Sequence, residues 1–513
     1  MILSELVSKN KILTNILGHL DHQILNQEVK GISSNSKDIK PGYIFVAIKG
    51  KNFDGESFIK EAKSKGAFLI LAENKNKKNC VSITKGTSRL VYSTLLSIYY
   101  KNQPNVIIGV TGTNGKTSTV EFCRQIWVQA GWKAASMGTL GTKVGTHQSD
   151  AVYNSSQNSL TTFEPNELYK NLNFLAQNDV SHLALEASSH GLDQFRLDGI
   201  KFSGAIFTNL SHDHLDYHGN IQSYFSAKKK LFTDILKKQS AVAINIDNEF
   251  GKKLYEEIAS KNHLILTFGE NEKANIRIKS ITHNNQTLKI SIEFRNKIYD
   301  ATLGMIGKFQ AYNVIASASI CIALGMEPSF VFKSLSYLKP ARGRMEIVSG
   351  ENHNSTIIID YAHTPEALKS VLLSLKEIKK ANGKLITLFG CGGDRDKGKR
   401  KLMGKIAHEY SDLIIVTDDN PRNESPAGIR SDILNGSPTA VEIPDRNKAI
   451  KHAVSLLKMN DFLLIAGKGH ETLQTVGLET LPFDDYAVAK EALKTMNLIE
   501  AWFWTYCGQK KNW

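Results

Sequence analysis

At 513 residues the chain is too long for one hydrophobic core, and its 41% hydrophobic and 22% charged residues, without an apolar run of bilayer length, argue against an integral membrane protein. The N-terminus has no secretory pattern and the five cysteines have no paired spacing, so we expect a protein of the reducing cytoplasm. The formal net charge of +14 favours anionic partners, but the lysines are scattered, and ATP with a small anionic substrate fits as well as nucleic acid.

Residues 1–100 are predicted to form a small N-terminal domain. Tyr43–Ile48 has the pattern of a strand, and residues 57–73 that of a helix, a stop at Gly66 and a second strand. The polar turn Ser34–Ser36 leaves two interpretations open, because it could cap a helix or bind a polar ligand.

The stretch Asn105–Gln129 is predicted to be a β-branched strand, a glycine loop and a helix that together bind phosphate. Backbone N–H groups converge at such a helix N-terminus, where the macrodipole is positive. Lys116 would reach the outer phosphates, and a hydroxyl from Thr117 or Ser118 would ligate Mg²⁺. The strict P-loop spacing fails because Val110 stands where a glycine is needed, but the glycine-rich pattern still favours ATP.

Residues 105–340 alternate between strands and helices, which predicts a mostly parallel sheet. One strand ends at Glu186, where it could hold a nucleotide-bound metal or cap the next turn. Another ends in the run HDHLDYH at 212–218. This run is close to a dinuclear metallohydrolase signature, but Tyr217 stands where a histidine is required, so we expect only part of it to serve a metal site.

The helix predicted at 220–238 has an apolar stripe that includes Ile221, Tyr224 and Leu231, and Lys228 falls on the same stripe. A core-facing lysine needs a partner or a special chemistry. Its stem could instead snorkel outward to water. The pattern alone leaves both alternatives open.

Residues 341–513 are predicted to form a second alternating unit with a doubly wound sheet. Its strands run into the polar clusters DYAHTP, GGDRDKGKR, DDNPR and GKGHE, which would line one crevice at the carboxyl edge of that sheet. Arg344, just before this unit, could reach a phosphate. The sequence does not indicate a function for the tryptophan-rich tail after Leu498.

The motifs of the chain resemble, in their order, those of the Mur ligase family, and within it the ligases that add the third residue of the peptidoglycan stem peptide. They are GVTGTNGKTST, LTTFEP, EASSHGL, FTNLSHDHLDYHG, SAKKKLF, ARGRMEIV, DYAHTP, FGCGGDRDKGKR, DDNPR and GKGHE. The resemblance spans nearly the whole chain. It implies an α/β protein with an N-terminal domain for the UDP substrate (1–100), a central P-loop-type ATPase domain (101–340) and a C-terminal Rossmann-like domain for the amino acid (341–513).

The resemblance also implies a reaction. ATP phosphorylates the D-Glu side-chain carboxylate of UDP-N-acetylmuramoyl-L-Ala-D-Glu, and the amine of the incoming amino acid attacks the acyl phosphate. Because two anions must meet, cations and Mg²⁺ would carry most of the catalysis. We expect a cytoplasmic monomer without nucleic-acid or membrane partners.

Matching motifs assigns the site residues. The ATP site would comprise Gly112, Thr113, Asn114, Gly115, Lys116, Thr117 and Ser118, with Asn313 at the adenine and Asp360 at the ribose. The magnesium ligands would be Thr117, Glu186, His214 and Lys228, the last as a carbamate formed with carbon dioxide. The catalytic set would be Lys116, Lys228, Glu186, His214 and Arg344, with Arg344 at the transferred phosphate. The UDP-substrate residues would be Ser36, Thr161, Thr162, Ser188, Gln194 and Arg196.

The motif DDNPR is similar to that of family members that add meso-diaminopimelate. The amino-acid site would comprise Arg395, Asp419, Asn420, Pro421, Arg422, Gly467 and Glu471. Arginines can pair with the distal carboxylate of diaminopimelate, which L-lysine lacks, so we predict diaminopimelate over lysine. A nucleic-acid-binding ATPase and a dinuclear metallohydrolase are the more remote alternatives.

Overall fold

The computed structural model describes residues 1–50, 54–74, 80–147, 149–153, 160–284, 286–348 and 355–508. The chain folds into two compact units. Unit 1 comprises Met1–Arg277 and Asn313–Ser334, and unit 2 comprises Ile278–Tyr312 and Leu335–Trp513. Within the described residues, no helix is both long enough and apolar enough to cross a bilayer.

The N-terminal part of unit 1 is a parallel sheet with short helices. Its strands, in order across the sheet, are β1 (Gly31–Ser33), β2 (Tyr43–Val46), β3 (Ala67–Ala72) and β4 (Val81–Ser82). Its helices are α1 (Leu3–Ser8), α2 (Lys11–Leu17), α3 (His22–Leu25), η1 (Ser36–Asp38), η2 (Gly55–Phe58), α4 (Ile59–Ser64) and α5 (Ser88–Tyr99). The predicted strand at 43 and the helix, stop and strand after 57 are confirmed. Asn35 caps η1, since its side chain accepts a hydrogen bond from the Lys37 N–H (3.1 Å).

The strands of the larger sheet that lie wholly within unit 1 have the order β12-β11-β10-β5-β9-β6-β7-β8. Its strands are β5 (Val106–Thr111), β6 (Ala134–Gly138), β7 (Gly141–Gly145), β8 (Asp150–Tyr153), β9 (His182–Glu186), β10 (Gly204–Phe207), β11 (Ala241–Asn245) and β12 (Leu264–Gly269). β5 pairs in parallel with β9 and β10, so Val110 lies beside Glu186 and Thr111 beside Phe207. The carboxyl ends of these strands therefore meet at one edge. The mostly parallel sheet is confirmed, although the antiparallel edge of β7 and β8 was not predicted.

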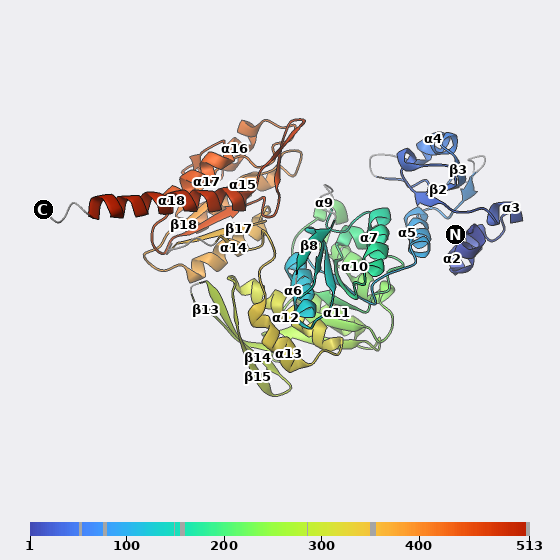
Figure 1. The fold of residues 1–513 in the computed structure, drawn as a ribbon, viewed down its shortest axis with the longest axis horizontal. Helices are drawn as coiled ribbons and strands as arrows, with labels where there is room; N and C mark the ends of the chain where they lie inside the picture. Colours follow the sequence, from blue (N-terminus) through green and yellow to red (C-terminus); the bar gives the residue numbers. More distant parts are fainter. Residues whose placement is uncertain are drawn as a thin grey trace. The chain divides into compact units, whose positions relative to one another are not determined.

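Helices follow these strands in the order expected of an α/β unit (Figure 1). They are α6 (Lys116–Gln129), α7 (Pro165–Gln177), α8 (Ser189–Asp193), α9 (Leu215–His218), α10 (Ile221–Lys230), the π-helix η3 (Leu231–Ile235), α11 (Glu249–Ile258), α12 (Lys308–Ala323) and α13 (Pro328–Ser334). α6 packs against β6 and β9, and α11 packs against β11. The predicted helix at 220–238 is therefore an α-helix that continues as one π turn.

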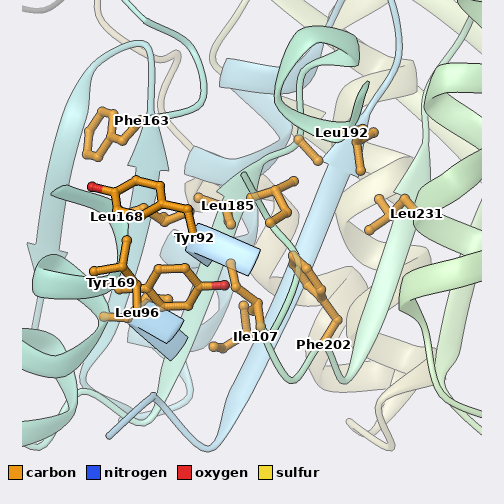
Figure 2. Packing of buried hydrophobic residues seen from close by; sticks show 14 of the residues in the cluster. Tyr92, Leu96, Ile107, Phe163, Leu168, Tyr169, Leu185, Leu192, Phe202 and Leu231 are labelled. Atoms are coloured by element: carbon orange, nitrogen blue, oxygen red, sulfur yellow. The ribbon is translucent and has the colours of Figure 1, made fainter. Parts of the chain in front are cut away.

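The core of unit 1 joins α5 and α7 to the larger sheet (Figure 2). Tyr92 and Leu96 come from α5, and Tyr169 comes from α7. Ile107 on β5 and Leu185 on β9 complete the contact and have no exposed surface. Burying one such aliphatic side chain stabilises a fold by about 1.5–3 kcal/mol.

Unit 2 contains a sheet of order β16-β17-β21-β18-β19-β20. Its strands are β16 (Glu346–Val348), β17 (Thr356–Asp360), β18 (Leu385–Phe389), β19 (Leu413–Val416), β20 (Val441–Glu442) and β21 (Phe462–Ala466). All neighbours pair in parallel except β16 with β17. The helices are α14 (Pro365–Ile378), α15 (Gly398–Tyr410), α16 (Pro426–Leu434), α17 (Arg446–Ser455) and α18 (Asp485–Gly508).

Alternate residues of β17 enter different hydrophobic clusters, as expected when helices cover both faces of a sheet. Ile358 packs with α14, α15 and α16 residues, and Ile357 and Ile359 pack with residues of α17 and α18. The predicted doubly wound sheet is thus confirmed. Two antiparallel hairpins of unit 2 were not predicted: β14 (Thr287–Phe294) with β15 (Lys297–Leu303), and β22 (Leu473–Val476) with β23 (Glu479–Pro482). The tail noted in the sequence enters α18, and residues 509–513 lie outside the described residues.

Candidate active site

The glycine loop lies where it was predicted, between β5 and α6. Gly112 and Gly115 have φ angles of +150° and +87°, which residues with a side chain rarely adopt. A Cβ on Gly115 would lie 2.2 Å from Asn313 Oδ1, a side chain on α12. The first N–H groups of α6 therefore follow a loop whose backbone can approach a ligand closely. Such an arrangement can bind a phosphate.

Two lysines converge on this loop. Lys116 Nζ donates hydrogen bonds to the carbonyl oxygens of Gly112 (2.9 Å) and Thr113 (2.7 Å). Lys228 Nζ donates to the same Gly112 oxygen (2.8 Å) and lies 4.4 Å from the Tyr224 ring centroid. The two lysine nitrogens thus share one carbonyl oxygen, which places both side chains at the phosphate loop.

Lys228 is only 1% exposed, so its stem does not snorkel to water. Burial, reinforced by the charge of Lys116, holds the pKa of Lys228 well below its usual range, and Asp213 opposes that shift. Of the two alternatives that the sequence left open, the structure shows the one in which Lys228 faces inward from the apolar stripe of its helix. A buried amine with a lowered pKa is easily neutral, and a neutral amine can react with carbon dioxide.

Glu186 ends β9 and is 1% exposed. Its carboxylate accepts hydrogen bonds from the Thr139 N–H (2.8 Å) and the Thr139 hydroxyl (3.2 Å). A Cβ on Gly138 would lie 2.3 Å from Glu186 Oε1, so the turn after β6 must come this close to the carboxylate. Thr139 also donates to Thr161 Oγ1 (3.4 Å). The Thr139 contact was not predicted, because it joins turns 47 residues apart.

A connected group of polar side chains continues from Glu186. The Thr162 hydroxyl donates to the Glu186 carbonyl oxygen and contacts Ser188 Oγ, each at 2.9 Å. Arg196 donates to the Thr162 carbonyl oxygen (2.7 Å) and to Gln194 Oε1 (2.8 Å). The UDP-substrate residues predicted between Thr161 and Arg196 are thus brought together by the fold. Ser36, the remaining one, donates instead to Glu61 Oε2 (2.7 Å).

His214 is the N-cap residue of α9 and has a φ of +53°. Its Nε2 lies 3.6 Å from Asp213 Oδ2. Burial lowers the pKa of His214, Lys116 and Lys228 lower it further, and Asp213 opposes them. Among the described residues, no group of three or more His, Cys, Asp or Glu side chains is placed to hold a metal ion. Magnesium prefers oxygen ligands and often takes several from substrate phosphates, so these residues fit an ion that arrives with ATP.

In unit 2, Asp360 ends β17 and accepts hydrogen bonds from the N–H groups of Met345 and Ala362, each at 2.8 Å. Burial raises the pKa of Asp360 to about 6, and Arg344 opposes this shift. The Arg344 guanidinium stacks over the Tyr361 ring at 4.6 Å. The residue predicted to bind the ribose and the arginine predicted to contact the phosphate therefore lie at the same strand end.

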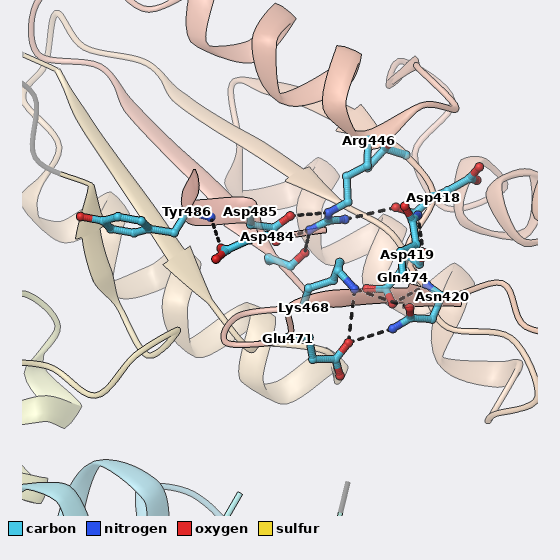
Figure 3. A network of polar contacts seen from close by, with 12 residues as sticks. Asp418, Asp419, Asn420, Arg446, Lys468, Glu471, Gln474, Asp484, Asp485 and Tyr486 are labelled. Carbon is cyan, nitrogen blue, oxygen red and sulfur yellow. Dashed lines mark hydrogen bonds and ion pairs between the residues drawn. The ribbon is translucent and has the colours of Figure 1, made fainter. Parts of the chain in front are cut away.

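The polar clusters after β18, β19 and β21 meet at the carboxyl edge of the unit 2 sheet, as predicted from the parallel pattern. Arg422 Nη1 donates to the Gly393 carbonyl oxygen (2.7 Å), and Asn420 Nδ2 donates to Glu471 Oε2 (2.8 Å; Figure 3). A Cβ on Gly392 would lie 2.8 Å from Arg422 Nη1 and 3.9 Å from Arg395 Cγ. Both predicted arginines therefore flank one glycine.

The same edge brings acidic groups together. A Cβ on Gly467 would lie 2.8 Å from Asp419 Oδ2. Burial and the Asp419 charge raise the pKa of Glu471, while Lys468 and Asn420 oppose the rise. Arginines after β18 and β19 and a carboxylate after β21 together complement a ligand that carries both a carboxylate and an amine.

The fold places the predicted residues of each site within one unit or the other. Unit 1 holds Ser36, Gly112, Thr113, Asn114, Gly115, Lys116, Thr117, Ser118, Thr161, Thr162, Glu186, Ser188, Gln194, Arg196, His214, Lys228 and Asn313. Unit 2 holds Arg344, Asp360, Arg395, Asp419, Asn420, Pro421, Arg422, Gly467 and Glu471.

We expect Gly115→Ala to raise the dissociation constant of ATP at least about tenfold, because the side chain would need a left-handed conformation and would strike Asn313. Gly131→Ala is the matched control, since Gly131 has a φ of +88° with no atom within 4 Å of the added Cβ. Isothermal titration with ATP and Mg²⁺ measures both. Equal loss of affinity in the two variants would show that backbone strain, not the loop, is responsible.

The fold and the phosphate loop define an α/β nucleotide-binding protein. Profiles described as Mur ligase family catalytic domain, Mur ligase middle domain and Mur ligase glutamate ligase domain match residues 28–108, 110–321 and 343–469. The chain belongs to the Mur ligase family and is an ATP-dependent ligase. The predicted family membership is therefore confirmed.

Relatives support this assignment over almost the full chain. The UDP-N-acetylmuramoyl-L-alanyl-D-glutamate–2,6-diaminopimelate ligase of Brucella melitensis is 40% identical over 473 residues, which cover 91% of this chain and 94% of the relative. The ligase of that name from Rickettsia bellii is 43% identical over 467 residues, 90% and 95% of the two chains. A solved structure of a ligase with this name has a TM-score of 0.67 at 29% identity, covering 94% of this chain and 99% of its own.

Proposed function

We propose that the chain joins meso-2,6-diaminopimelate to the D-glutamyl side-chain carboxylate of UDP-N-acetylmuramoyl-L-alanyl-D-glutamate, in peptidoglycan biosynthesis. The charged side chains at the carboxyl edge of the unit 2 sheet support this proposal. Arg395 and Arg422 flank Gly392, and Glu471 ends the neighbouring cluster. The distal end of diaminopimelate carries one carboxylate and one amine, which match these charges.

The phosphate loop would bind ATP. The N–H groups at the start of α6 and the Lys116 ammonium would neutralise the phosphates, and Asn313 would meet the nucleotide at the edge of the loop. Thr117, Glu186 and His214 would hold Mg²⁺, which supplies charge neutralisation as the phosphoryl group moves. Lys228 would join them as a carbamate, because its buried amine has a lowered pKa and faces the loop.

The remaining site residues would orient the two reacting groups. The group that links Thr161, Thr162, Ser188, Gln194 and Arg196 would hold the muramoyl dipeptide, with Ser36 at the uridine end. Arg344 would contact the transferred phosphoryl group, and Asp360 would bind the ribose. A carboxylate is a poor electrophile, so its activation as an acyl phosphate provides the leaving group that the amine displaces.

Other features of the protein stay predictions. A division at about residues 100 and 340 into three domains agrees in order with the family profiles. Use of ATP supports a cytoplasmic location. A monomer is expected, because each proposed substrate has its residues within this one chain.

The deciding experiment incubates the protein with ATP, Mg²⁺ and UDP-muramoyl dipeptide, together with either meso-diaminopimelate or L-lysine. We expect mass spectrometry to detect the diaminopimelate adduct, with ADP released only when all substrates are present. Preferential formation of the lysine adduct would overturn the assigned amino acid. ATP hydrolysis that responds to nucleic acid but not to the muramoyl dipeptide, or turnover without ATP, would overturn the ligase assignment.

A further inference from the structure

Lys468 lies at the carboxyl edge of the unit 2 sheet and has no exposed surface. It follows β21 and sits between Gly467 and the loop that carries Glu471. Its Nζ donates to the Leu473 carbonyl oxygen (2.6 Å) and contacts Glu471 Oε2 (3.4 Å) and Asn420 Oδ1 (3.5 Å; Figure 3). An ammonium has three N–H donors and Lys468 has three acceptors around it, so a full set of contacts holds this charge in place.

Asn420 connects this lysine to Glu471 and to the β22–β23 hairpin. Its side-chain oxygen accepts from the Thr475 N–H (2.9 Å) as well as from Lys468, and its nitrogen donates to Glu471 (2.8 Å). Lys468, Asn420 and Glu471 therefore contact one another pairwise. Removal of any one member would take a hydrogen bond from each of the other two, and such bonds are stronger in a buried network than in water.

The hairpin of β22 and β23 is the outer end of this network. Arg422 N–H donates to the Thr475 carbonyl oxygen (3.1 Å), and Gly477 N–H donates to the Arg422 carbonyl oxygen (2.7 Å). Gln474 Nε2 also donates to the Asp419 carbonyl oxygen (2.7 Å). Arg422 has a φ of +51°, an uncommon backbone conformation for a residue with a long side chain. The hairpin contacts hold this conformation and so direct the arginine over Gly393.

We propose that Lys468 is a positioning residue for selection of the amino acid, which fastens Glu471 and the β22–β23 hairpin to the loop Asp419–Arg422. The proposal rests on the function proposed above, in which Arg422 and Glu471 contact diaminopimelate. Lys468 itself has no surface for a ligand. It acts by keeping a carboxylate and an arginine at a fixed separation, and the zwitterionic end of the substrate must match that separation.

The charge of Lys468 has a second consequence. The groups that face Glu471 are Asp419, Lys468, Arg446 and Tyr361. Asp419 opposes ionisation of Glu471 and Lys468 favours it. Without Lys468, the Glu471 carboxylate would take up a proton at a higher pH than in the wild type, and a protonated carboxyl attracts the substrate ammonium only weakly.

Lys468→Met tests the proposal, because methionine is close in length but carries no charge. We expect the KM for diaminopimelate to rise about tenfold or more, while the KM values for ATP and UDP-muramoyl dipeptide change less than about twofold. The acid limb of kcat/KM for diaminopimelate should move to higher pH. Lys451→Met is the matched control, since Lys451 is half-exposed in a 3.8 Å pair with Glu491. An unchanged KM for diaminopimelate and an unmoved pH limb would overturn the proposal.

A second pair of variants tests the hairpin without removing a charge. Thr475→Pro deletes the N–H that Asn420 accepts, and Thr475→Val keeps that N–H while removing the hydroxyl. We expect the proline variant alone to lose affinity and selectivity for diaminopimelate over L-lysine, and this pair decides the question if Lys468→Met does not fold. Equal behaviour of the two variants would overturn the proposal. If the wild-type enzyme forms no diaminopimelate adduct, the proposed function is refuted. The inference about Lys468 rests on that function and would fail with it in this case only.

Discussion

Replacing Arg422 with alanine is expected to raise the KM for diaminopimelate about a hundredfold, with little change in the KM for ATP. Removing one partner of a desolvated, hydrogen-bonded ion pair costs about 2–5 kcal/mol, so a hundredfold effect lies within that range. The KM for diaminopimelate should rise, and that for ATP should not, because Arg422 lies at the carboxyl edge of the unit 2 sheet. The phosphate loop belongs to unit 1. Steady-state kinetics with each substrate varied in turn measures the effect.

The chain offers a matched control for this variant. Arg295 also has a φ of +51°, and it lies exposed at the turn between β14 and β15, so Arg295→Ala changes the same residue type in the same backbone conformation away from the crevice. Arg422→Lys should give an intermediate loss, since it keeps the charge but not the forked donor geometry. Equal KM values for diaminopimelate in Arg422→Ala and the wild type would show that Arg422 does not bind the amino acid.

Lys228→Met is expected to lower kcat by about a thousandfold and to leave ATP binding within a few-fold of the wild type. A group that acts only as the phosphoryl group moves contributes to kcat and not to ground-state binding. A methionine cannot form a carbamate, and the site would lose the anion that we propose for Mg²⁺. Rapid-quench assays of ADP formation and titration of ATP separate the two effects.

Lys229→Met is the control, because Lys229 is a neighbouring lysine that pairs with Glu257 at 2.7 Å on the outer side of α10. The lowered pKa of Lys228 also has a predicted sign in the pH profile. The neutral amine that carbamate formation needs predominates above the lowered pKa, so kcat should fall as the pH drops through it. Carbon-13 NMR after exchange with labelled bicarbonate should show a carbamate in the wild type and none in Lys228→Met. A kcat of Lys228→Met close to that of the wild type would contradict the proposed role of Lys228 as a carbamate.

Several site features followed from local sequence pattern, because each depends on residues close together in the chain. The phosphate loop was found from glycines next to a strand and a helix, and its position between β5 and α6 is confirmed. The inward direction of Lys228 came from helical periodicity, since a residue two turns from Ile221 shares its face. Strand ends such as Glu186 and Asp360 were found because apolar runs stop at a charge.

Other features of the structure could not be predicted from the sequence. The antiparallel hairpins were missed because their strands are short or half-exposed, as the exposed residues of β23 illustrate. The glycine in the strict P-loop position was absent, and family resemblance, not the spacing rule, explained the loop. Residues of the DDNPR motif were recognised by resemblance, while Lys468, which contacts Asn420 and Glu471, was not.

By itself the sequence determined on which strand end or helix face each candidate residue lies, since these properties have periods of two to four residues. Only the tertiary structure decided which of them meet. Asn313 reaches Gly115, Thr139 reaches Glu186 and Thr475 reaches Asn420 across long stretches of chain. The path by which a chain returns to a site depends on the packing of whole layers, and no local pattern records it.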